Sequence, residues 1–167
     1  MKATHITVLA SAALAVMAVG CGGSSASSSS AAAKTTPAST ASPASTAQVG
    51  QAYLSATAAV DSAYTTWKAD LVAADGNVLG LTSQGSAYAG VLTTFDSTIQ
   101  GIGATGTAAT DIATLVSDDN AVVSDLNSLG SQTSSTEAVW DAKTLSDGAA
   151  AIAQGDVVRA ALGLPPS

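Results

Sequence analysis

Carboxylates are the main reactive side chains in this sequence. It contains twelve Asp and Glu residues, but only one His and one Cys. His5 and Cys21 both lie near the N-terminus, so residues 22–167 contain neither residue type. That part of the chain therefore lacks the groups used in Ser-His-Asp and Cys-His catalysis, in His/Cys zinc sites, in haem ligation by His and in disulfides. The sequence predicts no metal site, no cofactor and no enzymatic activity.

Asp119 has the most informative position among the carboxylates. When residues 112–129 are laid out at about 100° per residue, Asp119 falls near the middle of an apolar face. One interpretation is a break between two helices, because residues 117–120 (Ser-Asp-Asp-Asn) are all good N-cap types. The other is a buried polar contact, to a ligand or to Lys68, because an ionised Asp on an apolar face is costly without a partner.

Three aromatic side chains are further candidates for contact with a ligand or partner. Tyr64 and Trp67 belong to a regular apolar stripe, which favours packing in the core. Trp140 lies on the side of its predicted helix away from Ala142 and Leu145. It either covers the loop after Gly130 or is an exposed contact residue of the kind that anchors interfaces.

The glycines at positions 101, 103 and 106 spell the pattern G-x-G-x-x-G. This pattern binds phosphates when it follows a strand and opens a crossover helix. Here it follows a helical stripe, so we interpret it as a connection between helices.

Four helical segments must position these side chains. Apolar residues recur at intervals of mostly three or four in four stretches: Tyr53, Ala56, Val60, Tyr64, Trp67, Leu71 and Ala74; Tyr88, Leu92, Phe95, Ile99 and Ile102; Ile112, Leu115, Val122, Leu126 and Leu129; and Ala138, Ala142, Leu145, Ala149 and Ile152. No stretch shows the sustained alternation of a strand. The sequence predicts an all-α protein, an antiparallel up-down four-helix bundle.

Local signals predict where these helices begin and end. Gly76-Asn77 ends the first helix, the glycines from 101 to 106 end the second, and Gly130 ends the third. The fourth is expected to begin with a capping box, Ser134 to Glu137, to bend at Gly155-Asp156 and to end before Gly163.

The N-terminus has the features of an export signal. Lys2 precedes an apolar stretch from residue 6 to residue 19, which is too short to span a membrane. The run from Leu14 to Cys21 resembles the lipobox of bacterial lipoproteins. That resemblance implies a signal peptide at residues 1–20, a lipidated Cys21 carrying acyl chains such as palmitate, and attachment to the cell membrane facing outside the cytoplasm. The composition, rich in Ala, Thr, Ser and Gly, resembles that of proteins from high-GC bacteria such as actinobacteria.

A linker separates the lipid from the folded part. Residues 21–48 are rich in Ser, Ala, Thr and Pro, a composition that cannot bury enough surface to offset the entropy of ordering. We therefore expect a disordered tether followed by one helical domain at residues 49–167. Residues 48–167 hold three basic and twelve acidic side chains, a net charge of −9, which repels nucleic acid and anionic headgroups. Membrane attachment is therefore expected through the lipid alone.

Three functions follow from these features. The first is a non-enzymatic module that binds an envelope protein or a wall polymer, most simply as a monomer. The second is a carrier that holds an apolar or amphipathic ligand between its helices, and it predicts a cavity larger than normal packing leaves. A distant third is a hydrolase that pairs Asp118 or Asp119 with Asp141, although no spacing supports it.

Overall fold

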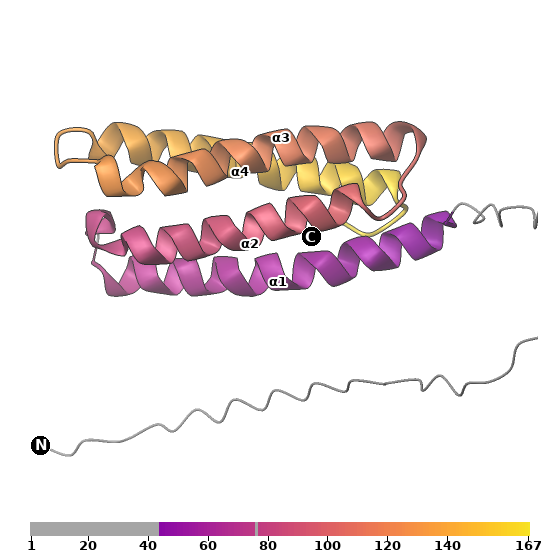
Figure 1. Cartoon of the computed structure of the whole chain (residues 1–167), viewed down its shortest axis with the longest axis horizontal. Coiled ribbons are helices and arrows are strands. Elements are labelled where there is room, and N and C mark those ends of the chain that lie inside the picture. The colour runs from indigo at the N-terminus through magenta and orange to yellow at the C-terminus, as the bar shows by residue number, and fades with distance from the viewer. Residues whose placement is uncertain (1–43, 76) are drawn as a thin grey trace, which may run out of the picture. The chain divides into compact units, whose positions relative to one another are not determined.

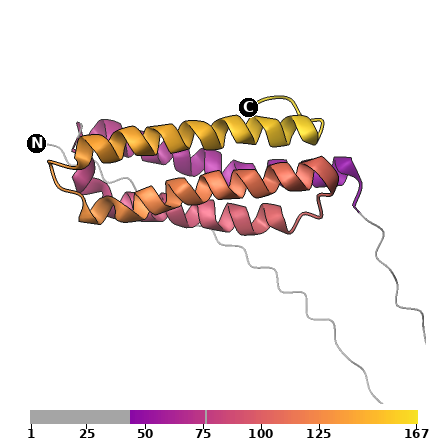
Figure 2. The same cartoon turned by 90° about the horizontal axis from the view of Figure 1, so that it is seen from above.

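The computed structural model describes residues 44–75 and 77–167. These residues form α1 (Thr46–Ala73), η1 (Val78–Leu81), α2 (Thr82–Gln100), α3 (Gly106–Ser128), η2 (Leu129–Ser131) and α4 (Glu137–Ala161), where η denotes a 3-10 helix. The four α-helices lie side by side and alternate in direction (Figure 1, Figure 2). Within the described ranges there is no strand. The predicted all-α, up-down four-helix bundle is confirmed.

The predicted signal peptide, Cys21 and most of the predicted tether lie outside the described residues. In the part of the chain that the structure does describe, no helix combines the length and the apolar character needed to cross a membrane.

The helix α1 begins three residues before the predicted domain boundary. Ser45 is its N-cap, and its hydroxyl accepts a hydrogen bond from the Gln48 backbone at 3.3 Å. The Gln48 side chain in turn accepts from the Ser45 backbone at 2.9 Å. This reciprocal pair is a capping box, which satisfies two backbone donors that the first turn would otherwise leave free.

The predicted apolar stripes of the first three helices form most of the core. Two clusters of buried side chains lie one after the other along the length of the bundle. One contains Trp67, Leu92, Val122, Leu126 and Trp140, and the other contains Tyr53, Phe95, Ile99, Ile112 and Val158. Both clusters draw on all four α-helices, so each of them holds the four helices together.

The predicted buried stripe of the fourth helix is wrong. Ala138, Ala142 and Ala149 are exposed, and Leu145 and Ile152 have exposed fractions of 67% and 56%. The buried face of α4 carries Trp140, Ala151 and Val158 instead. Alanine-rich helices give weak orientation signals, because alanine gains little from burial and packs on either face. The larger buried side chains, Trp140 and Val158, decide which face turns inward.

The ends of α4 also differ from the prediction. Its N-cap is Thr136 and no side chain caps it, so the capping box from Ser134 to Glu137 does not form. The chain turns before α4 through Thr133, whose carbonyl accepts from the backbones of Thr136 and Glu137. The helix is continuous through Gly155 and Asp156, and it ends before Gly163 as predicted.

The connections between the other helices follow the glycine signals. Residues 101–105 join α2 to α3, and Gly103 and Gly106 have φ values of 77° and 60°. Only glycine adopts these values at little cost, which explains the glycine pattern without a phosphate. After α1 the left-handed residue is Asp75, with φ 48°. The predicted cap at Gly76 lies outside the described residues.

Candidate functional site

The bundle is open along one side, between its first and last helices. Packing is extensive between α1 and α2, between α2 and α3, and between α3 and α4, whereas α1 and α4 hardly approach one another. The space between α1 and α4, which we call the groove, has a volume of about 660 Å³. Ligand pockets in proteins commonly measure about 300–1,000 Å³. The groove is therefore large enough for a small molecule.

All four helices line the groove, mostly with apolar side chains. Its lining includes Val60, Trp67 and Leu71 from α1, Leu92 and Phe95 from α2, Leu115, Val122 and Leu126 from α3, and Leu145, Ala149, Ala151 and Ile152 from α4. These residues include much of the stripes predicted for the first three helices. They also include the Leu145–Ala149–Ile152 face of α4, which the sequence correctly marked as apolar but wrongly as buried.

Small residues on α4 help to keep the groove wide. Gly148 and Gly155 both line it. A Cβ atom added at Gly148 would meet nothing within 4 Å, and one at Gly155 would lie 3.8 Å from the Tyr53 hydroxyl. Both glycines lie inside a continuous helix, where glycine lowers helix stability by about 1 kcal/mol relative to alanine. Larger side chains at these positions would project into the groove.

Aromatic rings form one wall of the groove. The Tyr88 ring stacks on Trp67, with centroids 6.5 Å apart, and its centroid lies 6.2 Å from that of Tyr64. Tyr64 is 39% exposed at this open side of the bundle, and Lys68 Nζ lies 5.2 Å from the centre of its ring. Burial raises the pKa of Tyr88 to about 12, so its hydroxyl stays protonated at neutral pH.

Asp119 is the most deeply buried charged residue that lines the groove. Its exposed fraction is 5%. The interpretation of residues 117–120 as a helix break is wrong, because α3 runs unbroken from Gly106 to Ser128. The pairing with Lys68 is also wrong, because the ion pairs among the described residues involve only Lys143. Asp119 is thus a buried carboxyl without a cation beside it.

A second buried carboxyl, Asp96 of α2, lies within hydrogen-bonding reach of Asp119. Burial is the main cause that raises the pKa of both groups, and the pKa of Asp119 reaches about 8 with the charge and hydrogen bond of Asp96 as further causes. Two carboxyls in contact cannot both ionise without strong repulsion, so they share a proton at neutral pH.

Sequence analysis missed Asp96, although a signal was present. It follows Leu92 by four residues and precedes Ile99 by three, so it falls on the same helical face as those two buried side chains. The same reasoning that singled out Asp119 would have found it.

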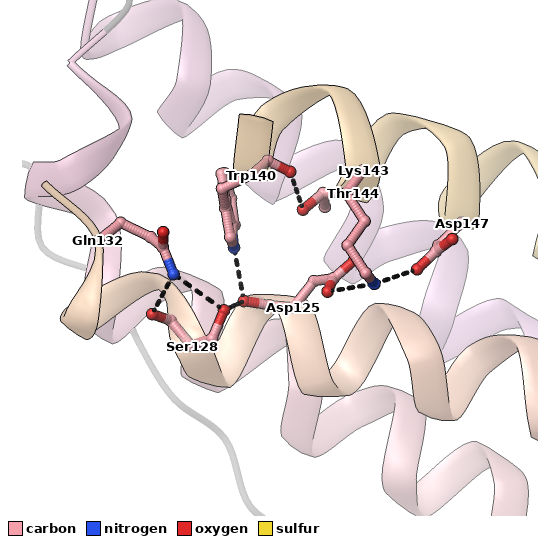
Figure 3. A network of polar contacts seen from close by, with 7 residues as sticks. All are labelled: Asp125, Ser128, Gln132, Trp140, Lys143, Thr144 and Asp147. Atoms are coloured by element: carbon pink, nitrogen blue, oxygen red, sulfur yellow. Dashed lines mark hydrogen bonds and ion pairs between the residues drawn. The ribbon is translucent and has the colours of Figure 1, made fainter. Parts of the chain in front are cut away.

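The four predicted contact residues divide between two places. Asp119, Tyr64 and Trp67 all line the groove, whereas Trp140 does not. Trp140 is buried, with an exposed fraction of 6%, and its Nε1 donates to the backbone oxygen of Asp125 at 2.8 Å (Figure 3). The interpretation of Trp140 as an exposed contact residue is therefore wrong. It joins α4 to α3 in the core.

Trp140 belongs to a polar network that fixes α4 on α3. Lys143 Nζ lies 2.6 Å from Asp125 Oδ1 and 2.6 Å from Asp147 Oδ2 (Figure 3). Asp125 is buried, whereas the Lys143 side chain is 57% exposed. The network lies outside the groove lining, so its role is to hold two helices together.

The carboxylates considered for hydrolysis do not share one cavity. Asp141 is exposed and borders a separate hollow with Leu71 and Glu137, whereas Asp119 lines the groove. Over residues 44–75 and 77–167, no three His, Cys, Asp or Glu side chains gather closely enough to hold a metal ion. Comparison with known proteins adds nothing to this geometry, since no protein family, curated protein or solved structure matches the chain.

Proposed function

We propose that this chain is a lipid-anchored envelope lipoprotein whose bundle binds an apolar or amphipathic small molecule without catalysing a reaction. The observation that supports ligand binding is the groove of about 660 Å³ between α1 and α4. A bundle that only needs to fold gains by closing its fourth side, because apolar area removed from water contributes about 25 cal/mol per Å². Here large apolar side chains stay open to solvent instead.

The composition of the groove suits such a ligand. Binding pockets are mostly apolar and aromatic, with a few polar groups that orient the ligand. The groove has apolar and aromatic walls, and Asp119 together with the tyrosines supplies the polar groups. Exposed apolar patches on a folded domain usually mark a surface that something else covers.

The lipid anchor is supported by the run of residues ending at Cys21, which resembles a lipobox. The domain surface is a poor membrane anchor because its net negative charge repels anionic headgroups. Attachment through lipid at Cys21 would place the bundle outside the cytoplasm at the membrane surface. There it would be close to apolar and amphipathic molecules of the envelope.

A protein or wall-polymer partner is the second candidate. The observation that favours it is the exposed apolar flank of α4 beside the groove, where Leu145 and Ile152 are 67% and 56% exposed. A partner helix could cover this surface and the mouth of the groove together. In either case we expect the unliganded chain to be a monomer.

Native mass spectrometry separates these candidates. The whole chain carrying Cys21→Ser, which removes the site of lipidation, is purified gently from its own host and measured before and after organic-solvent extraction. A discrete small adduct that extraction removes would support the carrier. An adduct with the mass of a protein would support the second candidate, and a bare polypeptide mass would contradict the carrier.

A further inference from the structure

The groove contains a buried carboxyl group that has no partner among the described residues other than a second acid. Asp119 lines the groove while only 5% exposed, and its Oδ2 is buried without a hydrogen-bond partner. Both oxygens of the neighbouring Asp96 are also buried without a partner other than Asp119. Placing acidic groups in a low-dielectric interior is costly, and a cation or a donor normally offsets that cost.

Lys68 and Arg159 also line the groove, but none of the cations among the described residues pairs with Asp119 or Asp96. Lys143 pairs with Asp125 and Asp147. Arg159 donates from Nε to the Pro165 carbonyl at 2.9 Å, and Lys68 lies over the Tyr64 ring. No cation in residues 44–75 and 77–167 forms an ion pair with Asp119 or Asp96. Among the described residues, Asp119 and Asp96 therefore have no cation paired with them, and a ligand could supply one.

Two tyrosine rings lie near Asp119 in the groove. Tyr53 and Tyr88 lie close enough to Asp119 for its charge to help raise the pKa of each hydroxyl, after the larger effect of burial. Trp67 stacks on Tyr88, and all three rings line the groove. The face of an aromatic ring attracts a cation, and aromatic side chains are the usual recognition elements for a quaternary ammonium group.

We propose that the groove selects amphipathic organic cations, with the ammonium group against Asp119 among the aromatic rings and the apolar tail along the groove. This inference rests on the proposed function and names the class of its ligand. The net charge of −9 on the domain favours the approach of a cation and disfavours an anion. A simple metal ion would leave the apolar lining of the groove uncovered.

The proton shared by the two acids is compatible with this binding. An ammonium beside Asp119 favours its ionised form. The shared proton is then held by Asp96, which is not among the residues that line the groove, and Asp119 carries the negative charge that faces the ligand. In this step one O–H bond breaks on Asp119 and one forms on Asp96, so the complex neither gains nor loses a proton.

Calorimetric titration with matched probes tests the inference. The whole chain carrying Cys21→Ser is titrated with decyltrimethylammonium, decanol and decanoate, all below the concentrations at which they form micelles. The three probes share the apolar tail and differ in the charge of the head. We expect decyltrimethylammonium to bind at least about tenfold more tightly than decanol, and decanoate to bind most weakly.

Two variants locate the charge that causes this preference. Asp119→Asn keeps the size of the side chain, and we expect it to reduce the preference for decyltrimethylammonium over decanol to about twofold or less. Asp141→Asn removes one exposed negative charge outside the groove lining, and we expect it to keep the tenfold preference. Circular dichroism confirms that both variants keep their helices.

The outcomes separate the inference from the proposed function. Binding of decanol and decyltrimethylammonium with equal affinity to the unsubstituted bundle would overturn the cation preference and leave the carrier standing. A preference that survives in Asp119→Asn would overturn the role of Asp119. Failure of all three probes to bind would overturn the carrier and with it the inference. The comparison of the three probes on the bundle with Asp119 intact does not depend on whether the Asp119→Asn variant folds.

Discussion

Asp96 of α2 and Asp119 of α3 meet inside the bundle, and each has an exposed fraction of only 5%. A hydrogen bond between two carboxyls requires a proton on one of them, and the pKa of about 8 for Asp119 provides it near neutral pH. A pair of leucines at these positions would pack without this electrostatic cost. Because Asp119 lines the groove, experiments on this pair also test the groove.

The pH dependence of stability tests the buried pair. The pKa of Asp119 rises from 3.8 in the unfolded chain to about 8 in the folded chain. Between these values the folded chain binds a proton that the unfolded chain has released, so the free energy of unfolding falls as pH rises from about 4 to about 8. The slope for one proton is at most about 1.4 kcal/mol per pH unit. Denaturant unfolding at pH 5 and pH 8 measures it.

Asp119→Asn should flatten this slope and raise the free energy of unfolding at pH 8 by about 1 kcal/mol or more, because the amide donates to Asp96 without ionising. Asp141→Asn, on the surface, should leave the slope unchanged. Asp147 and Asp156 have lowered pKa values, so their contributions are lost below pH 4, outside this window. Equal slopes in the two Asn variants would contradict the buried pair.

Filling the groove from α4 should block ligand binding without harming the fold. Gly148→Leu places an isobutyl group where a Cβ atom meets nothing within 4 Å. We expect the ligand adduct and the binding of decanol to be lost, while helix propensity raises stability by about 0.5–1 kcal/mol. Native mass spectrometry and thermal unfolding measure the two effects.

The matched control is Gly90→Leu on α2. Gly90 is exposed, has the same open surroundings and does not line the groove. It should gain similar helix stability and retain the ligand. Loss of binding in both variants, or in neither, would argue against the groove as the binding site.

Replacing the buried indole should destabilise the bundle. Trp140→Phe removes the hydrogen bond from Nε1 to the Asp125 carbonyl and leaves a space in the core, and we expect a loss of about 1–3 kcal/mol in the free energy of unfolding. Val139→Ala, next to it but 74% exposed, should change stability by less than about 0.5 kcal/mol. Similar losses in both variants would contradict the burial of Trp140.

The two capping boxes, one formed and one only predicted, should respond differently to alanine. Ser45→Ala removes the side-chain cap of α1, and we expect a loss of about 1 kcal/mol. Ser134→Ala removes a hydroxyl that caps no helix and should cost less than about 0.5 kcal/mol. Chemical denaturation of the two variants measures the difference. A larger loss for Ser134→Ala than for Ser45→Ala would contradict the start of α4 at Glu137 with Thr136 as its N-cap.

Helical spacing of large apolar residues was sufficient to predict the first three helices. Leu92, Phe95 and Ile99 repeat at helical period and are all buried, because large side chains on one face gain from burial only when that face turns inward. The fourth helix was predicted as a helix but with the wrong face inward. Its alanines gain too little to orient it, so contacts of Trp140 and Val158 with other helices decide its rotation.

The sequence by itself determined the helical segments, the glycine connections and the position of Asp119 on an apolar face. These depend on neighbours along the chain, whose interactions follow from local geometry. Only the tertiary structure decided that α3 continues through Asp119, that Asp96 meets it, and that α1 and α4 leave a groove between them. The meeting of Asp96 with Asp119 and the groove both depend on distances between helices, which are fixed when side chains far apart in the sequence pack together.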